Sequence, residues 1–172
     1  HFTLSADGNT AFISSFHDGL EIIDLGVSFA NGDASVATSP SLTGSLDTSK
    51  SAKGVTLSAD GNTAFVADDN HGLRIIDVSN PASPSLTATL TGTSSNEVIL
   101  SADGNTAFIA DGSGGLDIID VSNLASPSLT GTYNTSSASK GVTISADGNT
   151  AFVADGGGGI QIIDVSNKAS PS

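Results

Sequence analysis

The stretch LSADGNTAFVADDNHGLRIIDVSNPASPSLTATL, from Leu57 to Leu90, decides the fold, because the chain contains four versions of it. Each version carries an Asp-Gly-Asn-Thr tetrad, and successive tetrads are 53, 43 and 44 residues apart, starting at Asp7, Asp60, Asp103 and Asp147. A glycine follows each tetrad aspartate by 12 positions and a second aspartate follows it by 17. All variation in length therefore falls where units join, which is typical of stacked supersecondary modules.

Each unit contains four short strand patterns. In the second unit, residues 54–58 (GVTLS) alternate like a half-buried strand, and Ala-Asp-Gly-Asn then makes a tight reversal in which glycine supplies the left-handed conformation. Residues 63–68, 72–79 and 85–90 follow as further strands. No window has a helical period, so no helix is predicted. Units of this length with strand signals alone predict an all-β fold of β-propeller blades, each with four antiparallel strands.

Two of these runs resemble a known family. GLRIIDVSNPASPSLTATL (72–90) and GLDIIDVSNLASPSLTGTY (115–133) look like LVIVD repeats, which are β-propeller blades of bacterial and archaeal secreted or surface proteins. The resemblance implies the fold and a secreted or cell-surface location. It implies no particular reaction and no catalytic residue.

The predicted blades cover residues 1–46, 53–90, 97–133 and 140–172, as one propeller domain or part of one. The last blade is incomplete, since no fourth strand follows IQIIDVSNKASPS. This leaves an open edge along Ile160 to Val165, and exposed edges invite pairing. Three arrangements stay open: a longer propeller of about six to eight blades, two copies that complete one ring or a larger assembly, and a small ring of four blades.

Composition excludes several functions. The net charge is −13 and the chain has five basic residues, so nucleic-acid binding is excluded for want of a basic patch. Cysteine is absent, which excludes disulfides and thiolate catalysis. No apolar stretch approaches the roughly 18 residues of a membrane span, so no membrane insertion is expected. Abundant Ser, Thr, Gly, Asn and Asp with few lysines suits a secreted protein.

Candidate ligand-binding residues are expected where the loops between second and third strands meet the connectors between blades, because both emerge on one face of a propeller. Asp68, Asp111 and Asp155 end the second strands, with Ser15 in the first unit. The three residues that follow bear large or charged side chains in units one and two (FHD and DNH) and are glycine-rich in units three and four (GSG and GGG). The candidate site therefore consists of His17, Asp18, Lys53, Asp68, Asp69, Asn70 and His71.

Cofactors are unknown from the sequence, with calcium as a candidate. Asp68, Asp69, Asp111 and Asp155 could offer the oxygens that calcium prefers, although no D-x-D-x-D-G pattern is present. A turn-stabilising role explains the repeated aspartates equally, above all Asp24, Asp77, Asp120 and Asp164. His17 and His71 could bind a transition metal or act as a base, or lie solvated in loops. Arg74 fits a structural salt bridge.

Three further features carry predictions. Asn134-Thr135-Ser136 is a sequon for N-glycosylation, or an ordinary polar connector. The extra residues within Gly26 to Thr38 form an extended turn between strands three and four, either a tolerated insertion or a contact loop carrying Phe29. The second-strand phenylalanines are expected to be buried between blades: Phe12, Phe65, Phe108 and Phe152.

The sequence favours a non-catalytic extracellular binding, adhesion or structural scaffold, with another protein or a matrix component as its partner. The scarcity of Lys, Arg and His supports this reading. A calcium-dependent propeller hydrolase or lyase is one alternative. A self-assembling subunit is the other, a homo-oligomer that completes the open edge.

Overall fold

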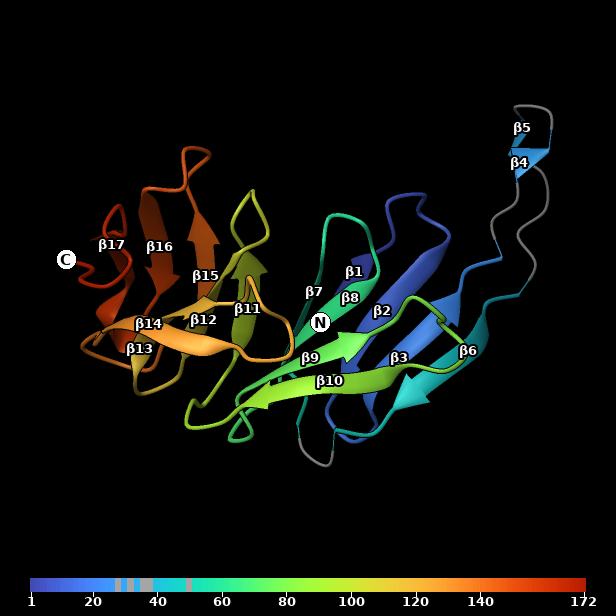
Figure 1. Ribbon diagram of the computed structural model, residues 1–172, viewed down its shortest axis with the longest axis horizontal. Helices are drawn as coiled ribbons and strands as arrows, with labels where there is room; N and C mark the ends of the chain where they lie inside the picture. The colour runs from blue at the N-terminus through green and yellow to red at the C-terminus, as the bar shows by residue number, and fades with distance from the viewer. Residues whose placement is uncertain (27–28, 31–32, 35–38, 49–50) are drawn as a thin grey trace.

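The computed structural model describes residues 1–26, 29–30, 33–34, 39–48 and 51–172. These residues form four antiparallel sheets in chain order, the blades of a propeller-like fold, which confirms the predicted fold class (Figure 1). Blades 1 to 3 have four strands and blade 4 has three.

The strands of each blade follow one another across the sheet. Blade 1 comprises β1 (Phe2–Leu4), β2 (Thr10–Ser15), β3 (Gly19–Asp24) and β6 (Ser41–Leu46). Blade 2 comprises β7 (Gly54–Leu57), β8 (Thr63–Ala67), β9 (Leu73–Asp77) and β10 (Ser85–Leu90). Blade 3 comprises β11 (Glu97–Leu100), β12 (Thr106–Asp111), β13 (Gly115–Asp120) and β14 (Ser128–Tyr133). Blade 4 comprises β15 (Gly141–Ile144), β16 (Thr150–Ala154) and β17 (Ile160–Asp164).

The tetrad turns join first and second strands by the same hydrogen bonds in every blade. In blade 2 the Ser58 hydroxyl donates to Asp60 at 2.5 Å, and the Asn62 N–H donates to the same carboxylate at 3.1 Å. These bonds, the serine's first, hold the pKa of Asp60 below its usual range. Gly61 has φ 73°, the left-handed conformation that the sequence predicted. The tetrad aspartates are therefore structural.

The second aspartate of each unit closes the turn after the third strand. Asp77 accepts a hydrogen bond from the N–H of Ser79 at 2.9 Å. The same bond recurs at Asp24, Asp120 and Asp164, with distances of 2.8 to 2.9 Å. The predicted turn-stabilising role of these aspartates is confirmed.

Blades pack through two faces that recur in each unit. We call the face that carries the second-strand phenylalanine the front face, and the opposite face the back face. Three buried clusters hold the chain together, and in each one the front face of a blade packs on the back face of the next. In the last cluster, Phe108, Leu116 and Ile118 of blade 3 meet residues of blade 4 that include Val142 and Val153.

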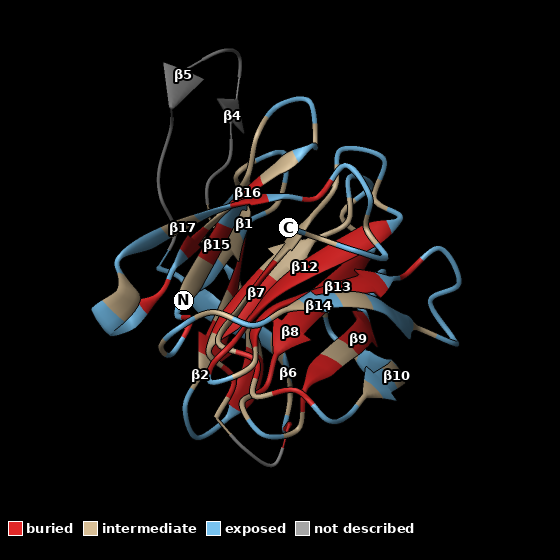
Figure 2. Cartoon of the chain, turned by 90° about the vertical axis from the view of Figure 1, so that its left-hand side faces the viewer, coloured by how far each residue is buried: buried red, intermediate tan, exposed pale blue. Residues whose placement is uncertain are grey.

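The first strands line the inside of the arrangement. Strand β7 contacts both β1 and β11, and β11 contacts β15. The fourth strands β6, β10 and β14 form the exposed rim, whereas β8, β12 and β13 are buried (Figure 2). Successive sheets therefore stack side by side with their first strands inward, as in a propeller.

The prediction that all four second-strand phenylalanines are buried is confirmed for three. Phe12, Phe65 and Phe108 are at most 3% exposed. Phe152 is only half-buried, because it lies on the front face of blade 4, against which no described residue of another blade packs. The burial of this phenylalanine therefore depends on whether another blade packs on the front face of its own blade.

Other details differ from the sequence-based picture. The insertion between β3 and β6 contains a small hairpin of β4 (Phe29–Ala30) and β5 (Asp33–Ala34). The remainder of the insertion lies outside the described residues, and so does the side chain of Phe29, whose predicted contact role stays a prediction. A 3-10 turn spans Gly156–Gly158, where no helix was predicted. Within the described part of the chain, no helix is long and apolar enough to span a bilayer.

Candidate functional site

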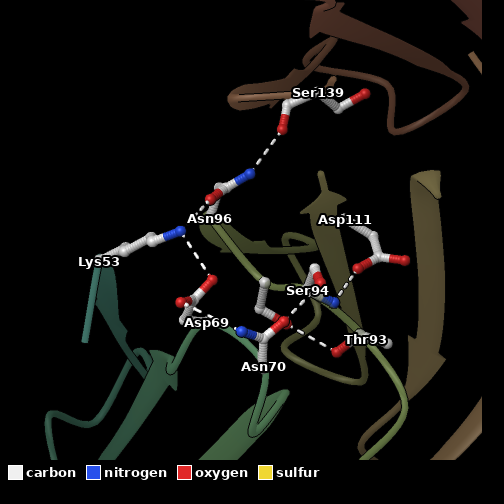
Figure 3. A network of polar contacts seen from close by, with 9 residues as sticks. Lys53, Asp69, Asn70, Thr93, Ser94, Asn96, Asp111 and Ser139 are labelled. Carbon is white, nitrogen blue, oxygen red and sulfur yellow. Dashed lines mark hydrogen bonds and ion pairs between the residues drawn. The ribbon is translucent and has the colours of Figure 1, made fainter. Parts of the chain in front are cut away.

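The loop between β8 and β9 meets the connector that leads to blade 3, as predicted for the candidate face. Lys53 Nζ donates to Asp69 Oδ1 and to Asn96 Oδ1, both at 2.8 Å. The side-chain amide of Asn96 then donates to the backbone carbonyl of Ser139 at 2.8 Å (Figure 3). One chain of bonds thus joins residues that precede β7, β11 and β15.

Asn70 extends this network toward the connector. Its side-chain oxygen accepts a hydrogen bond from the Ser94 hydroxyl at 3.0 Å, and its amide lies 3.5 Å from Asp69 Oδ2 (Figure 3). Of the predicted binding residues, Lys53, Asp69 and Asn70 therefore come together. Asn96 and Ser94, which complete the network, were missed because asparagine and serine in a polar connector carry no distinctive signal.

Asp69 has an unusual backbone. Its φ is 44°, and it is the only described non-glycine residue with positive φ. Glycines occupy the same place in the next two blades, with φ 42° at Gly112 and 40° at Gly156. The Asp69 backbone exchanges two hydrogen bonds with Ser95, at 3.1 and 3.0 Å, which hold this conformation. Aspartate is among the residues that tolerate it.

Asp68 and His71 belong to a second cluster, built around Arg74. Asp68 is fully buried, accepts a hydrogen bond from Thr48 Oγ1 at 2.8 Å and pairs with Arg74 Nε at 2.7 Å. Arg74 Nη2 also donates to the Thr48 carbonyl at 2.6 Å, and His71 Nδ1 lies 3.5 Å from Asp68 Oδ2. This is the structural salt bridge predicted for Arg74, and it ties blade 2 to the end of blade 1.

Asp155 is engaged in a similar way in blade 4. It is fully buried and accepts hydrogen bonds from the hydroxyls of Thr135 at 2.6 Å and Ser136 at 3.1 Å. The N–H of Ser137 lies 3.1 and 3.2 Å from its two oxygens. The carboxylate thus fixes the connector between blades 3 and 4.

Blade 3 differs, because Asp117 occupies the strand position that Arg74 has in blade 2. Asp111 accepts a hydrogen bond from the N–H of Ser94, and Asp117 accepts one from Thr132 Oγ1 at 2.8 Å. Both carboxylates line a cavity of about 300 Å³. Burial, with a smaller contribution from the charge of Asp117, raises the pKa of Asp111 to about 6, against the opposing bond from Ser94. Burial also raises the pKa of Asp117.

Asp117 was missed as a site residue. The aligned third-strand residues are Glu21, Arg74, Asp117 and Gln161, which look like a tolerant polar position. The signal that could have found it is an acid at this third-strand position together with an acid at the end of the second strand. Only blade 3 has both acids, Asp117 and Asp111.

His17 and Asp18 lie exposed in the loop of blade 1. Asp18 accepts a hydrogen bond from the Ser15 hydroxyl at 3.1 Å, and the His17 ring is 6.4 Å from that of Phe16. Within the described residues, no hydrogen bond or ion pair joins them to the other predicted site residues.

The candidate calcium ligands are divided among these networks. Asp68 and Asp69 take part in separate clusters of blade 2, and Asp111 and Asp155 belong to blades 3 and 4. Among the residues that the structure describes, no three His, Cys, Asp or Glu side chains are grouped to hold a metal ion.

A further polar contact, not predicted, links the first strands of three blades. Glu97 accepts a hydrogen bond from the N–H of Val142 at 3.1 Å, and its other oxygen lies 3.7 Å from His1 Nε2. His1, Glu97 and the glycines 54 and 141 share one repeat position. A side chain at Gly141 would come within 2.9 Å of the Glu97 carboxylate, so glycine there leaves it room.

Another cavity lies on the opposite face. It has a volume of about 560 Å³, lies between the tetrad turns of blades 3 and 4, and is lined by Asp103, Asp147 and Lys168 among others. Asn134, in the predicted glycosylation sequon, is exposed and borders the Asp111 cavity. Its modification stays a prediction.

Solved structures resemble this fold at low sequence identity. Hydrazine synthase of Kuenenia stuttgartiensis is 22% identical with a TM-score of 0.72, and the match covers 96% of this chain and 46% of that one. A putative 6-phosphogluconolactonase from Bacteroides fragilis is 13% identical with a TM-score of 0.73, covering 100% and 52%. The β-propeller domain of Cps50 (Swd1) from Myceliophteria thermophila is 13% identical with a TM-score of 0.71, covering 96% and 55%.

The chain thus spans about half the length of the solved structures that it matches. Among curated proteins, the search found no match. The family model of the LVIVD repeat matches four times, over residues 3–48, 51–91, 97–135 and 140–172. These matches cover nearly the whole sequence and coincide with the four sheets. The chain therefore belongs to the LVIVD repeat family.

Proposed function

We propose that this chain is part of a non-catalytic scaffold, secreted or on the cell surface, that binds another protein or a matrix component through the face formed by the loops after the second strands and the connectors between blades. One observation carries the proposal. The carboxylates predicted to bind a ligand or a metal are mostly engaged by the chain itself: Asp68 by Arg74 and Thr48, Asp69 by Lys53, and Asp155 by its connector. These carboxylates hold the loops of the candidate face in place.

Rigid loops suit recognition of a surface, because little conformational entropy is then lost on binding. The charge of −13 defines the kind of partner, since a strongly acidic surface attracts a basic one and repels acidic molecules. The occurrence of LVIVD repeats in secreted and surface proteins supports the location.

Binding of a basic partner can be tested with model probes. The chain is immobilised and exposed to lysine-rich and glutamate-rich peptides of equal length, at 50 and 500 mM NaCl. We expect the lysine-rich peptide alone to bind, with affinity at least about tenfold lower at high salt. Equal binding of both peptides, or binding of neither, would contradict the proposal.

A calcium-dependent hydrolase or lyase is the second candidate. The pair Asp111 and Asp117 favours it, because two carboxylates that share a cavity and have raised pKa values can act as acid and base. Calorimetric titration with calcium and an assay of 6-phosphogluconolactone hydrolysis test this alternative. Turnover that the Asp111→Asn substitution abolishes would show that the chain is an enzyme and would contradict the scaffold proposal. Absence of both a heat signal with calcium and turnover would support the scaffold proposal.

A further inference from the structure

We infer that the cavity beside Asp111 and Asp117 binds a guanidinium group, the head of an arginine side chain that the partner contributes. The inference deepens the proposed binding role and rests on it, since it names the side chain by which the partner is held. The cavity belongs to blade 3 and lies on the candidate face, where the loop after β12 meets the connector from blade 2.

In blade 2 a guanidinium group occupies the equivalent place. Arg74 and Asp117 hold the same register position on the third strands of blades 2 and 3. Arg74 Nε donates to the buried Asp68 at 2.7 Å, and Arg74 Nη2 donates to the Thr48 carbonyl of the preceding connector at 2.6 Å. The repeat can therefore hold a guanidinium group between the acid that ends the second strand and the connector before that blade.

Blade 3 keeps the acid of this arrangement and has a second acid in place of the arginine. Asp111 accepts a hydrogen bond from the N–H of Ser94, and its other oxygen points away from that bond (Figure 3). Asp117 accepts one at Oδ1, from Thr132 Oγ1. Within the described residues, neither Oδ2 atom has a hydrogen-bond donor and no ion pair reaches either carboxylate. Both acids thus offer an oxygen to a ligand.

These two side chains are nevertheless almost completely buried. Asp111 is 9% exposed and Asp117 is 4% exposed, and both line the cavity of about 300 Å³. A buried carboxylate is costly unless it pairs with a cation or takes up a proton, and burial accordingly raises the pKa of both groups. A cation that enters the cavity would relieve this cost by supplying a counter-charge.

Blade 4 satisfies its equivalent acid in another way. Asp155 accepts hydrogen bonds from the hydroxyls of Thr135 and Ser136 in the preceding connector, at 2.6 and 3.1 Å. In the connector before blade 3, the Thr93 hydroxyl pairs instead with the Ser95 hydroxyl at 2.7 Å. Among the described residues, the acid of blade 3 is therefore the one that neither an arginine nor a hydroxyl group engages.

The chemistry of the cavity favours a guanidinium group over an ammonium group or a metal ion. Guanidinium has several N–H donors in one plane and can bridge two carboxylates, whereas ammonium is a compact, strongly hydrated charge. Calcium prefers about six to eight oxygen ligands. In the described part of the chain, no three acidic or histidine side chains are grouped for a metal. Leu90 and Leu129 also line the cavity and suit the apolar stem of an arginine.

Titration of the 172-residue chain with N-acetyl-arginine amide, followed by amide NMR at pH 8, above the raised pKa of Asp111, tests the inference. We expect shifts at the amides of Thr93 and Gly114, which line the cavity. N-acetyl-citrulline amide has the same shape without the charge and should cause none. Asp117→Asn should weaken arginine binding at least about tenfold. Asp18→Asn removes the same charge from the exposed loop of blade 1 and should leave binding unchanged.

Asp117→Arg provides a second test. It rebuilds the arrangement of blade 2 in blade 3, so the chain's own guanidinium group should fill the cavity and the arginine derivative should no longer bind. Urea unfolding checks that each variant is folded, and Asp117→Asn, which keeps the shape of the side chain, decides if Asp117→Arg is not.

Four results would overturn the inference. They are equal binding of the arginine and citrulline derivatives, a lysine derivative that binds as tightly as the arginine one, equal weakening by Asp117→Asn and Asp18→Asn, and no arginine binding up to about 20 mM. A basic peptide could still bind the candidate face through its overall charge in each case. The salt-dependent peptide experiment therefore tests the proposed function separately.

Discussion

Phe108 and Phe152 occupy the same position in repeats of nearly the same sequence, yet they differ in burial. Phe108 is fully buried between blades 3 and 4, whereas Phe152 is half-buried on the front face of the last blade. Both lie opposite an isoleucine of the third strand in the same register. The repeat sequence thus encodes the sheet and its two apolar faces, and only the neighbouring blade turns a face into a core.

The largest expected effect comes from truncating this phenylalanine in the two blades. Phe108→Ala should lower the free energy of unfolding by about 3–5 kcal/mol, because it leaves a cavity in a packed interface. Phe152→Ala should cost about 1 kcal/mol, since solvent already reaches the side chain. Urea unfolding of both variants, at a concentration where the chain is monomeric, measures the difference. Equal losses of unfolding free energy in the two variants would contradict the inference that the neighbouring blade turns this face into a core.

The next effect concerns the third-strand position that differs between blades 2 and 4. Arg74→Ala should destabilise the chain by about 3 kcal/mol, because it leaves the fully buried Asp68 carboxylate without its cation. Gln161→Ala is the matched control and removes only a bond to the Gly158 carbonyl. The double variant Asp68→Asn with Arg74→Ala should recover part of the loss in a thermal unfolding measurement. No recovery would mean that Arg74 acts through packing alone.

In blade 3 the carboxylate that ends the second strand, Asp111, predicts a pH dependence. The pKa of Asp111 is raised from 3.8 to about 6, so between these values the folded state binds more protons than the unfolded state. Its favourable contribution is therefore complete below pH 3.8 and is lost as the pH rises through 6. Asp111→Asn should stabilise the chain at pH 8, by about 1 kcal/mol after allowance for solvent screening.

The gain from Asp111→Asn should vanish at pH 4. Asp120→Asn is the opposite control, because hydrogen bonds from Ser122 lower the pKa of Asp120. That variant should lose stability at pH 4, 6 and 8 alike, because the contribution of a carboxylate with a lowered pKa is lost only when the pH falls below 3.8. Unfolding of the parent chain and both variants at pH 4, 6 and 8 provides the test. A gain for Asp111→Asn that is the same at all three pH values would show that burial of its charge is not the cause.

The smallest effect is expected at the partly exposed ion pair of the candidate face. Lys53→Ala should cost about 0.5–1 kcal/mol, because Lys53 and Asp69 are 28% and 27% exposed and solvent screens them. The loss should shrink when the salt concentration is raised from 50 to 500 mM. A loss above about 2 kcal/mol would mean that the chain of bonds through Asn96 is cooperative.

The fold was predictable because its signals are local and repeated four times. Strand alternation, the Asp-Gly turns and the fixed spacing each depend on neighbours within one unit, and the register of all four sheets agrees with them. The side-chain networks were not predictable, because they join residues of different units. Lys53 and Asn96 are 43 positions apart, and the length of each connector decides which partners meet.

The burial of Phe152 was overestimated for a related reason. Apolar periodicity indicates which face of a strand is suited to a core, and it carries no information on whether a neighbour covers that face. The surroundings of Asp111 were missed for the same reason. Its neighbour on the third strand of blade 3 is the acid Asp117, where blade 2 has Arg74.

Amide hydrogen exchange, followed strand by strand on the monomeric chain, tests the central claim most directly. If stacking makes the core, amides of β12 should exchange only through global unfolding, and those of β17 should exchange at least about a hundredfold faster through local opening. Equal protection of β12 and β17 in the monomer would contradict this account, since each blade would then be stable without a neighbour on its front face.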